Sequence, residues 1–151
     1  MSLFNVFKIS TQGMTAQRER LESASANLAN ANTTRTDAGG PYRRRDVIFE
    51  AVELERPGDS FGAAFVSHVS RDLPQGVEVT TRMAEADEGI KRYQPEHPDA
   101  DADGYVTLPD VDPLEETVNI LSAARAFEAN ATAFNTAKEL ARASLRLGEG
   151  A

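Results

Sequence analysis

The sequence predicts an α+β protein whose long N- and C-terminal helices pair as a coiled coil, with a small β-rich middle segment. Two observations lead to this prediction. Apolar residues recur every seven positions near both ends of the chain, and the centre is acidic and interrupted by Pro and Gly. We therefore expect an N-terminal helix in residues 1–34, a β-rich or loop segment in 35–111, and in 112–151 a C-terminal helix that pairs with the first.

The first helix is expected to run from near Leu3 to about Asn30. Its seven-residue repeat consists of Phe7, Met14, Leu21 and Leu28. Gly13 interrupts the helix at a cost of about 1 kcal/mol relative to Ala, which predicts a bend or a close helix contact there. Asn and Thr side chains compete for backbone hydrogen bonds and are expected to end the helix: Asn27, Asn30, Asn32, Thr33 and Thr34.

Strand-like stretches follow the first helix and are separated by turn residues. We expect strands at Arg44–Leu54, Ala63–Val69 and Val77–Arg82, with turns at Pro57–Asp59 and Leu73–Gly76. These strands would form one small antiparallel sheet or an extended β-hairpin. The acidic stretch Met83–Gly89 is expected to be a loop.

The last helix has the clearest start signal in the chain. Asp112 is a suitable N-cap, Pro113 suits the first helical position, and Glu115 lies three residues after the cap. The helix is expected to continue to Leu147 and to end at Gly148. Its repeat consists of Ile120, Phe127, Phe134 and Ala141, with Leu145 beside it.

The expected seam between the helices is weakly apolar because most of its residues are Ala. At about 25 cal/mol per Å² of buried apolar surface, such a seam stabilises a helix pair less than a Leu-rich one. We therefore expect the helices to need neighbouring chains, with Asn119, Asn130 and Asn135 fixing their register. A monomeric two-helix domain with a few buried polar groups is the alternative.

Charge is distributed unevenly along the 151 residues. Residues 57–112 contain 4 basic and 12 acidic side chains, so the whole net charge of −8 corresponds to this middle part. Such a field repels phosphate backbones and anionic lipids, so we expect no nucleic acid partner and no membrane-surface partner. The basic run Arg43–Arg45 is expected to form a solvated or subunit-pairing strand edge.

The side chains indicate no catalytic constellation. The absence of Cys excludes disulfides, thiol catalysis and thiolate metal sites. Two histidines, His68 and His97, lack a metal-ligand partner or a nucleophile motif, and we expect His97 to make a structural hydrogen bond. We therefore predict no enzyme activity, no cofactor, no metal and no small-molecule substrate.

An Asp-rich turn resembles part of a calcium-binding loop. Asp99, Asp101, Asp103 and Asp110 occupy ligand-like positions, and Gly104 lies at the sixth. Prolines before and after it argue against the flanking helices of an EF-hand. A solvated turn is the favoured interpretation, and an isolated calcium-binding turn is the alternative.

The ends of the chain resemble bacterial flagellar axial proteins, the family of rod, hook and hook-associated subunits. The resemblance lies in the run from Ser25 to Thr34 (SANLANANTT) and in two parts of the last helix, EETVN at 115–119 and ARAFEAN at 124–130. Between the ends, GGPYRRRDVIF at 39–49 and HPDADADGYV at 97–106 resemble the proximal-rod members of that family. Phe127 departs from the usual Tyr, and Leu108–Asp110 departs from a common Pro-Asn pair.

This resemblance implies a non-enzymatic subunit of the periplasmic flagellar rod that is made in the cytoplasm and exported by the flagellar type III apparatus without a cleaved signal peptide. The implied partners are other rod subunits, a rod-base adaptor, the membrane ring and the chain itself in a helical hetero-assembly. We expect assembly through helix packing at Phe7, Met14, Leu21, Leu28, Asn27, Asn30, Asn32, Ile120, Phe127, Asn130, Phe134 and Leu145. Lateral contacts are expected at Tyr42, Arg43, Arg44, Arg45 and Tyr105.

Two other classes of protein remain open at this stage. A soluble coiled-coil adaptor or regulator would explain the helices equally well, but it gives no reason for the Asn- and Thr-rich end of the first one. A calcium-dependent acidic binding module would rest only on the Asp-rich turn.

Overall fold

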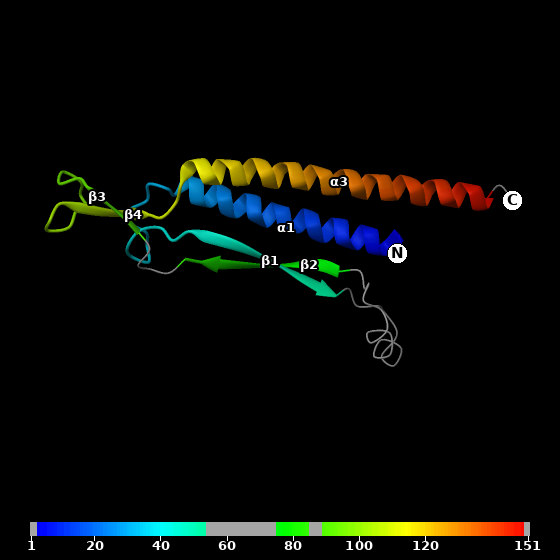
Figure 1. The fold of residues 1–151 in the computed structure, drawn as a ribbon, viewed down its shortest axis with the longest axis horizontal. Coiled ribbons are helices and arrows are strands. Elements are labelled where there is room, and N and C mark those ends of the chain that lie inside the picture. Colours follow the sequence, from blue (N-terminus) through cyan, green and yellow to red (C-terminus); the bar gives the residue numbers. More distant parts are fainter. Residues whose placement is uncertain (1–2, 54–74, 85–88, 150–151) are drawn as a thin grey trace, which may run out of the picture. The chain divides into compact units, whose positions relative to one another are not determined.

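The computed structural model describes residues 3–53, 75–84 and 89–149 (Figure 1). The described part is an α+β fold with one helix near each end and short strands between them, which confirms the predicted class. The elements are α1 (Leu3–Ala29), β1 (Arg45–Glu53), β2 (Gln75–Met83), β3 (Gly89–Tyr93), β4 (Tyr105–Pro109) and α3 (Pro113–Glu149).

Contacts between residues divide the chain into two compact units. The first unit is drawn from residues 1–17, 49–79 and 125–151, and the second from 18–48 and 80–124. In the first unit the beginning of α1 lies beside the later part of α3, and in the second the end of α1 lies beside the beginning of α3 (Figure 1). Each unit therefore contains segments that are far apart in the sequence.

The helix ends follow the predicted capping chemistry with one exception. Asn30 ends α1, because its side-chain Nδ2 donates to the Ala26 carbonyl and its Oδ1 accepts a hydrogen bond from Thr33. At the start of α3, the Asp112 Oδ1 accepts the Leu114 N–H at 2.8 Å. Gly148 was predicted to end α3 but lies inside it, because its backbone stays outside the left-handed conformation of a C-terminal Gly.

The strands form two separate two-stranded sheets in the described residues, which corrects the prediction of one sheet. β1 pairs with β2, and their bounds agree with the predicted Arg44–Leu54 and Val77–Arg82. β3 and β4 pair antiparallel, with Ile90 opposite Leu108 and Tyr93 opposite Tyr105. The predicted strand at Ala63–Val69 lies outside the described residues.

The most buried side chains are mostly small. Ala16, Ala24, Ala123 and Ala137 are buried along the helices, and Val106 is buried on the β3–β4 hairpin. Small side chains leave little apolar area to remove from water, so each contributes less stabilisation than a buried Leu. The fold therefore has a thin apolar core, as the composition of the seam predicted.

Candidate assembly interface

Small residues occupy the contact between the helices in both units. On α3, Glu116, Ala123 and Ala137 are buried and stand seven or fourteen residues apart, with Asn130 half-buried between them. The larger Phe127 of the predicted repeat is 39% exposed. The buried Ala123 and Ala137 are small and permit close backbone approach, whereas Phe127 stays partly exposed.

The first unit contains a close contact between α1 and α3 at Gly13. A Cβ atom at Gly13 would lie 2.8 Å from the Asn130 Oδ1, which is too near for an ordinary contact. Six residues nearer the N-terminus, the ring of Phe7 meets that of Phe134 edge to face, with the ring centroids 5.0 Å apart. The close helix contact predicted at Gly13 is thus confirmed, and its partner is a residue from the predicted assembly set.

The second unit contains a fully satisfied buried amide, Asn27. Its Oδ1 accepts hydrogen bonds from the Arg45 N–H at 2.8 Å and from the Tyr42 hydroxyl at 3.0 Å. Its Nδ2 donates to the Arg45 carbonyl at 3.0 Å and to the Glu116 Oε1 at 3.1 Å. Two acceptor and two donor bonds use the capacity of an amide, so Asn27 ties the end of α1 to β1 and to α3.

Arg44 lies beside this amide and is shared by three carboxylates. Its Nε lies 2.9 Å from the Asp46 Oδ1 and 3.6 Å from the Oε1 of the buried Glu116, and its Nη2 lies 3.5 Å from Glu115. Burial lowers the pKa of Arg44, but the charges of the three carboxylates outweigh burial and raise the pKa overall. The guanidinium therefore stays charged, and the carboxylates that it pairs with belong to its own chain.

The Asp-rich turn uses its carboxylates to shape the loop between β3 and β4. The Asp101 Oδ1 accepts the N–H groups of Asp103 and Tyr105, and Gly104 adopts a left-handed φ of 83°. Asp99 accepts a hydrogen bond from the Thr34 hydroxyl at 2.8 Å. Among the described residues no group of three or more acidic, His or Cys side chains is placed to hold a metal ion.

His97 makes the structural hydrogen bond expected of it. Its Nδ1 accepts the Asp99 N–H at 3.1 Å within the same turn. The other histidine, His68, lies outside the described residues.

The two helices present different exposed faces. On α1, Phe4 is the one large apolar residue that is exposed in the described range, and Lys8, Thr11, Thr15, Arg18, Glu19 and Glu22 make up most of the rest. On α3, Leu114, Val118 and Leu121 are more than half exposed and share one face at i, i+4 and i+7. Further along, Leu140, Leu145 and Leu147 are also exposed.

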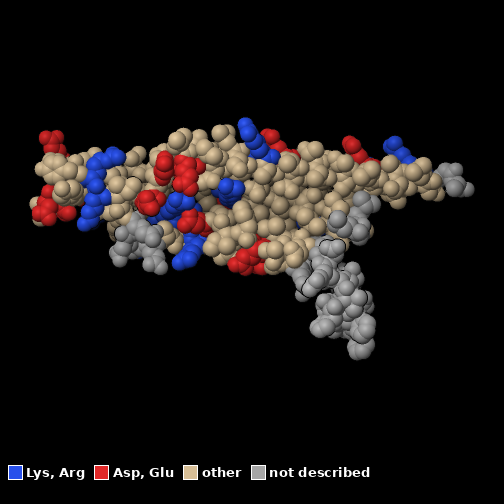
Figure 2. Space-filling view, viewed as in Figure 1, with Lys and Arg blue, Asp and Glu red and all other residues tan. Residues whose placement is uncertain are grey.

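Charged side chains are unevenly placed on the visible surface. Figure 2 shows acidic and basic side chains gathered over the starts of β1 and α3, in the second unit, and fewer of them along the rest of α3.

Some predicted site residues lie against one another or against other parts of the chain, and others are exposed or half-buried. Phe7 meets Phe134, and Asn130 lies against Gly13. Tyr42 and Arg44, expected to make lateral contacts, are bonded to Asn27 and to carboxylates of their own chain. Arg43, Arg45 and Tyr105 have exposed side chains, as do Asn32, Phe127 and Leu145. Met14, Leu21, Leu28 and Ile120 are half-buried.

Sequence reasoning missed the pairing of Asn27 with Glu116, which are 89 residues apart. Glu116 reads as a surface residue, since Glu is seldom fully buried without a partner. Its seven-residue spacing from Ala123 was the one available signal that it faces α1. Ser23, which lines a cavity beside Asn27, was likewise not chosen. Asn119 lines the same cavity, and the sequence indicated it only as a residue that fixes the register of the helices.

None of the described helices has the length and hydropathy required to cross a membrane.

Two models of flagellar families match this chain. The model of the flagella basal body rod protein matches residues 7–35, and the model of the C-terminal part of the flagellar basal body rod FlgEFG proteins matches residues 102–147. These ranges include the end of α1 with Asn27, and most of α3. The two paired helices are therefore the parts that define the class, the flagellar basal-body rod proteins.

Full-length relatives narrow the class to one family. The flagellar basal-body rod protein FlgC of Borreliella burgdorferi is 38% identical over 99% of this chain and 100% of the relative. FlgC of Bacillus subtilis is 38% identical and FlgC of Escherichia coli O6:H1 is 36% identical, with the same coverage. The chain belongs to the FlgC family of flagellar basal-body rod proteins. These matches give no support to the adaptor or the calcium-binding alternative.

Proposed function

We propose that the chain is a structural subunit of the rod of the flagellar basal body, held there by packing of its terminal helices against those of neighbouring subunits. Membership of the FlgC family supports the rod and the basal body as its location. Assembly with other components of the basal body follows from this role.

The exposed apolar face of α3 is the observation that carries the proposal. Leu114, Val118 and Leu121 are 73%, 58% and 55% exposed, and they lie on the opposite side of the helix from the buried Glu116 and Ala123. An exposed apolar stripe of this kind is unfavourable in a soluble monomer, because it stays in contact with water. A helix that packs against neighbours on two sides buries such a stripe. Contacts between non-equivalent surfaces produce open helical assemblies, the form of a rod.

The finer parts of the proposal concern location and assembly. The chain takes its place in the proximal rod, where its partners are other rod subunits, a rod-base adaptor and the membrane ring. Its helices pair as a coiled coil, and the many packed helix contacts transmit torque together. The subunit acts as a building block without catalytic activity.

Export precedes assembly in this proposal. The chain is made in the cytoplasm and crosses the flagellar type III apparatus largely unfolded, without a cleaved signal peptide. The buried residues between the helices are mainly Ala, Ser and Asn, which supports this proposal. Helices that are weakly stabilised within the chain become ordered when they bind neighbouring subunits. The absence of Cys removes the risk of premature disulfides on the way.

Substitution on the exposed face of α3 tests the proposal. The double variant Val118→Asp, Leu121→Asp should abolish swimming and remove the chain from purified basal bodies, while expression and the helical circular dichroism of the purified chain persist. The matched control, Thr11→Asp with Thr15→Asp, places the same charges on the polar face of α1 and should leave incorporation unchanged. Normal swimming of the α3 variant would refute the proposal.

A further inference from the structure

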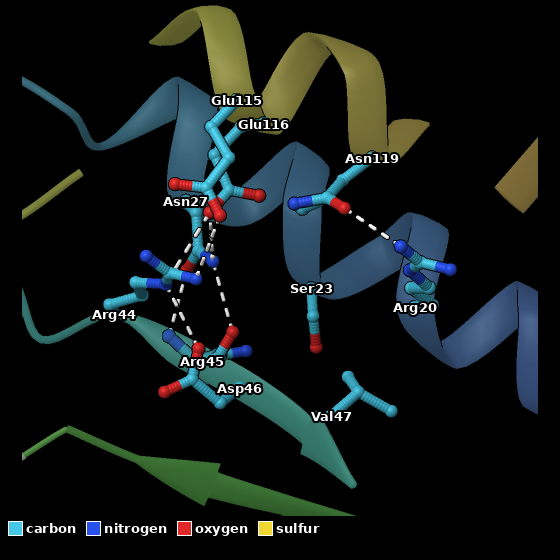
Figure 3. Close-up of a pocket in the computed structure, with 11 residues that line it drawn as sticks. Arg20, Ser23, Asn27, Arg44, Arg45, Asp46, Val47, Glu115, Glu116 and Asn119 are labelled. Carbon is cyan, nitrogen blue, oxygen red and sulfur yellow. Dashed lines mark hydrogen bonds and ion pairs between the residues drawn. The ribbon is translucent and has the colours of Figure 1, made fainter. Parts of the chain in front are cut away.

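A cavity of about 240 Å³ lies in the second unit, between the end of α1, the start of β1 and the start of α3 (Figure 3). It is smaller than the usual site of a drug-sized ligand and suits a single side chain. Its lining is mostly polar and consists of Arg20, Ser23, Ala24, Asn27, Arg44, Arg45, Asp46, Val47, Glu115, Glu116 and Asn119.

The charges around the cavity balance. Three arginines face three carboxylates, and Arg44 is shared by all of the carboxylates. A negatively charged ligand would be repelled by Asp46, Glu115 and Glu116, and a positively charged one by the arginines. The cavity therefore favours a neutral polar ligand.

Several polar groups of the lining have unused hydrogen-bonding capacity. Ser23 is 7% exposed, its hydroxyl has no hydrogen bond within the described residues, and its side chain points from α1 toward β1 (Figure 3). The Asn119 Oδ1 accepts a hydrogen bond from the Arg20 Nη2 at 2.8 Å, whereas its Nδ2 has no partner in the described part of the chain. Arg20 makes no ion pair there either, so donors of Arg20 and Asn119 remain available beside the Ser23 hydroxyl.

We propose that this cavity receives the carboxamide side chain, Asn or Gln, of a neighbouring rod subunit. The carbonyl of such a group would accept hydrogen bonds from Asn119 and Arg20. Its NH₂ would donate to the Ser23 hydroxyl oxygen and to the Glu115 carboxylate, which is half exposed at the same cavity. A carboxamide alone among the common polar side chains supplies an acceptor and two donors without adding charge. The proposal rests on the proposed function for the identity of the neighbour.

Small probe molecules test the chemistry of the cavity directly. The ¹⁵N-labelled chain, at a concentration where circular dichroism shows the helices formed, is titrated with propionamide, propionate and propylammonium. Propionamide should cause saturable shifts at the backbone amides of Arg20, Ser23 and Asn119. Ser23→Ala should weaken this binding about fivefold, the value of one hydrogen bond, and Thr15→Ala should leave it unchanged. Tighter binding of either charged probe, or no saturable shift, would overturn the carboxamide assignment.

A second variant tests the neighbour as the source. Ser23→Gln supplies a carboxamide from the chain itself, so it should reduce incorporation of the chain into basal bodies several-fold, and Thr15→Gln should not. Incorporation of Ser23→Gln at the wild-type level would contradict the proposal that a side chain of a neighbouring subunit occupies the cavity. Failure of the rod assignment has a different signature, because the unsubstituted chain would then be absent from purified basal bodies.

Discussion

α1 and α3 make the same seam but differ on their other sides. The buried side of α1 includes Asn27 with four hydrogen bonds and Gly13 with its close contact, while its exposed side is mostly polar. α3 contributes Ala123 and Ala137 to the seam and exposes Leu114, Val118 and Leu121 elsewhere. The comparison indicates that the residues of α1 serve mainly contacts within the chain. Those of α3 serve contacts within the chain and also contacts with other subunits.

The largest expected effect on stability is at Asn27. Asn27→Ala leaves the Arg45 N–H, the Tyr42 hydroxyl and the Glu116 carboxylate without their shared partner. At about 1–3 kcal/mol for each unsatisfied buried group, and with partial rescue by water, we expect a loss of about 3 kcal/mol in the free energy of unfolding. Urea unfolding followed by circular dichroism measures it. A loss below about 1 kcal/mol would contradict the central role of this amide.

A smaller loss is expected at Gly13, also on the inner side of α1. Gly13→Ala places a methyl group against the Asn130 side chain and should cost about 1–2 kcal/mol, despite the better helix propensity of Ala. The double variant Gly13→Ala, Asn130→Ala should recover most of this loss, because it removes the atoms that clash. Additive losses in the double-variant cycle would show that the two residues act independently.

On α3 the comparison predicts almost no change in stability for an exposed apolar residue. Leu147→Asp removes a side chain that is 80% exposed and should change the unfolding free energy by less than about 0.5 kcal/mol. The same variant should weaken incorporation into basal bodies if the exposed leucines near the end of α3 also contact neighbours. A large loss of stability in the isolated chain would mean that α3 is covered within its own chain, and the contrast with α1 would fail.

The two helices could be predicted from the sequence because their signals are local. The seven-residue repeats, the Asp112 cap and the Asn-rich end of α1 each act within a few residues, and the structure has α1 and α3 close to the predicted bounds. β3 and β4 were not predicted. The run Gly89–Tyr93 is short and contains Lys91 and Arg92, so it lacks the apolar alternation of a typical strand.

The candidate site was predicted only in part, because its decisive contacts are non-local. Asn27 was chosen for its place at the helix end, yet its partners Arg45 and Glu116 depend on how the chain returns to α1. From the sequence, Arg44 is expected to be one of three surface charges in the run Arg43–Arg45. Its contacts with Glu115 and Glu116 form only in the folded chain, because these residues are far from it in the sequence. The three-segment division at residues 34 and 111, the coiled-coil packing and the assembly roles of Asn32 and Leu145 stay predictions.

The last expected effect depends on pH and concerns Tyr42, which is bonded to the inner side of α1. Burial raises the pKa of the Tyr42 hydroxyl, the Glu116 charge raises it further, and Arg45 partly opposes both. A raised pKa means that the folded chain holds this proton more tightly than the unfolded chain, whose value is near 10. Protonated Tyr42 therefore makes its full contribution to the stability of the fold below pH 10. This contribution is lost as the pH rises through the pKa of Tyr42 in the folded chain.

Urea unfolding of the wild type and of Tyr42→Phe between pH 8 and pH 11 measures the contribution of Tyr42 to the free energy of unfolding. Phe cannot ionise and loses the hydrogen bond to Asn27, so Tyr42→Phe should be less stable by about 1 kcal/mol at pH 8. The gap between the two proteins should narrow above pH 10, because the wild type then loses a contribution that the variant never had. A gap that widens with pH would mean that the ionised Tyr42 is favoured in the fold, opposite to the effect of its burial beside Glu116.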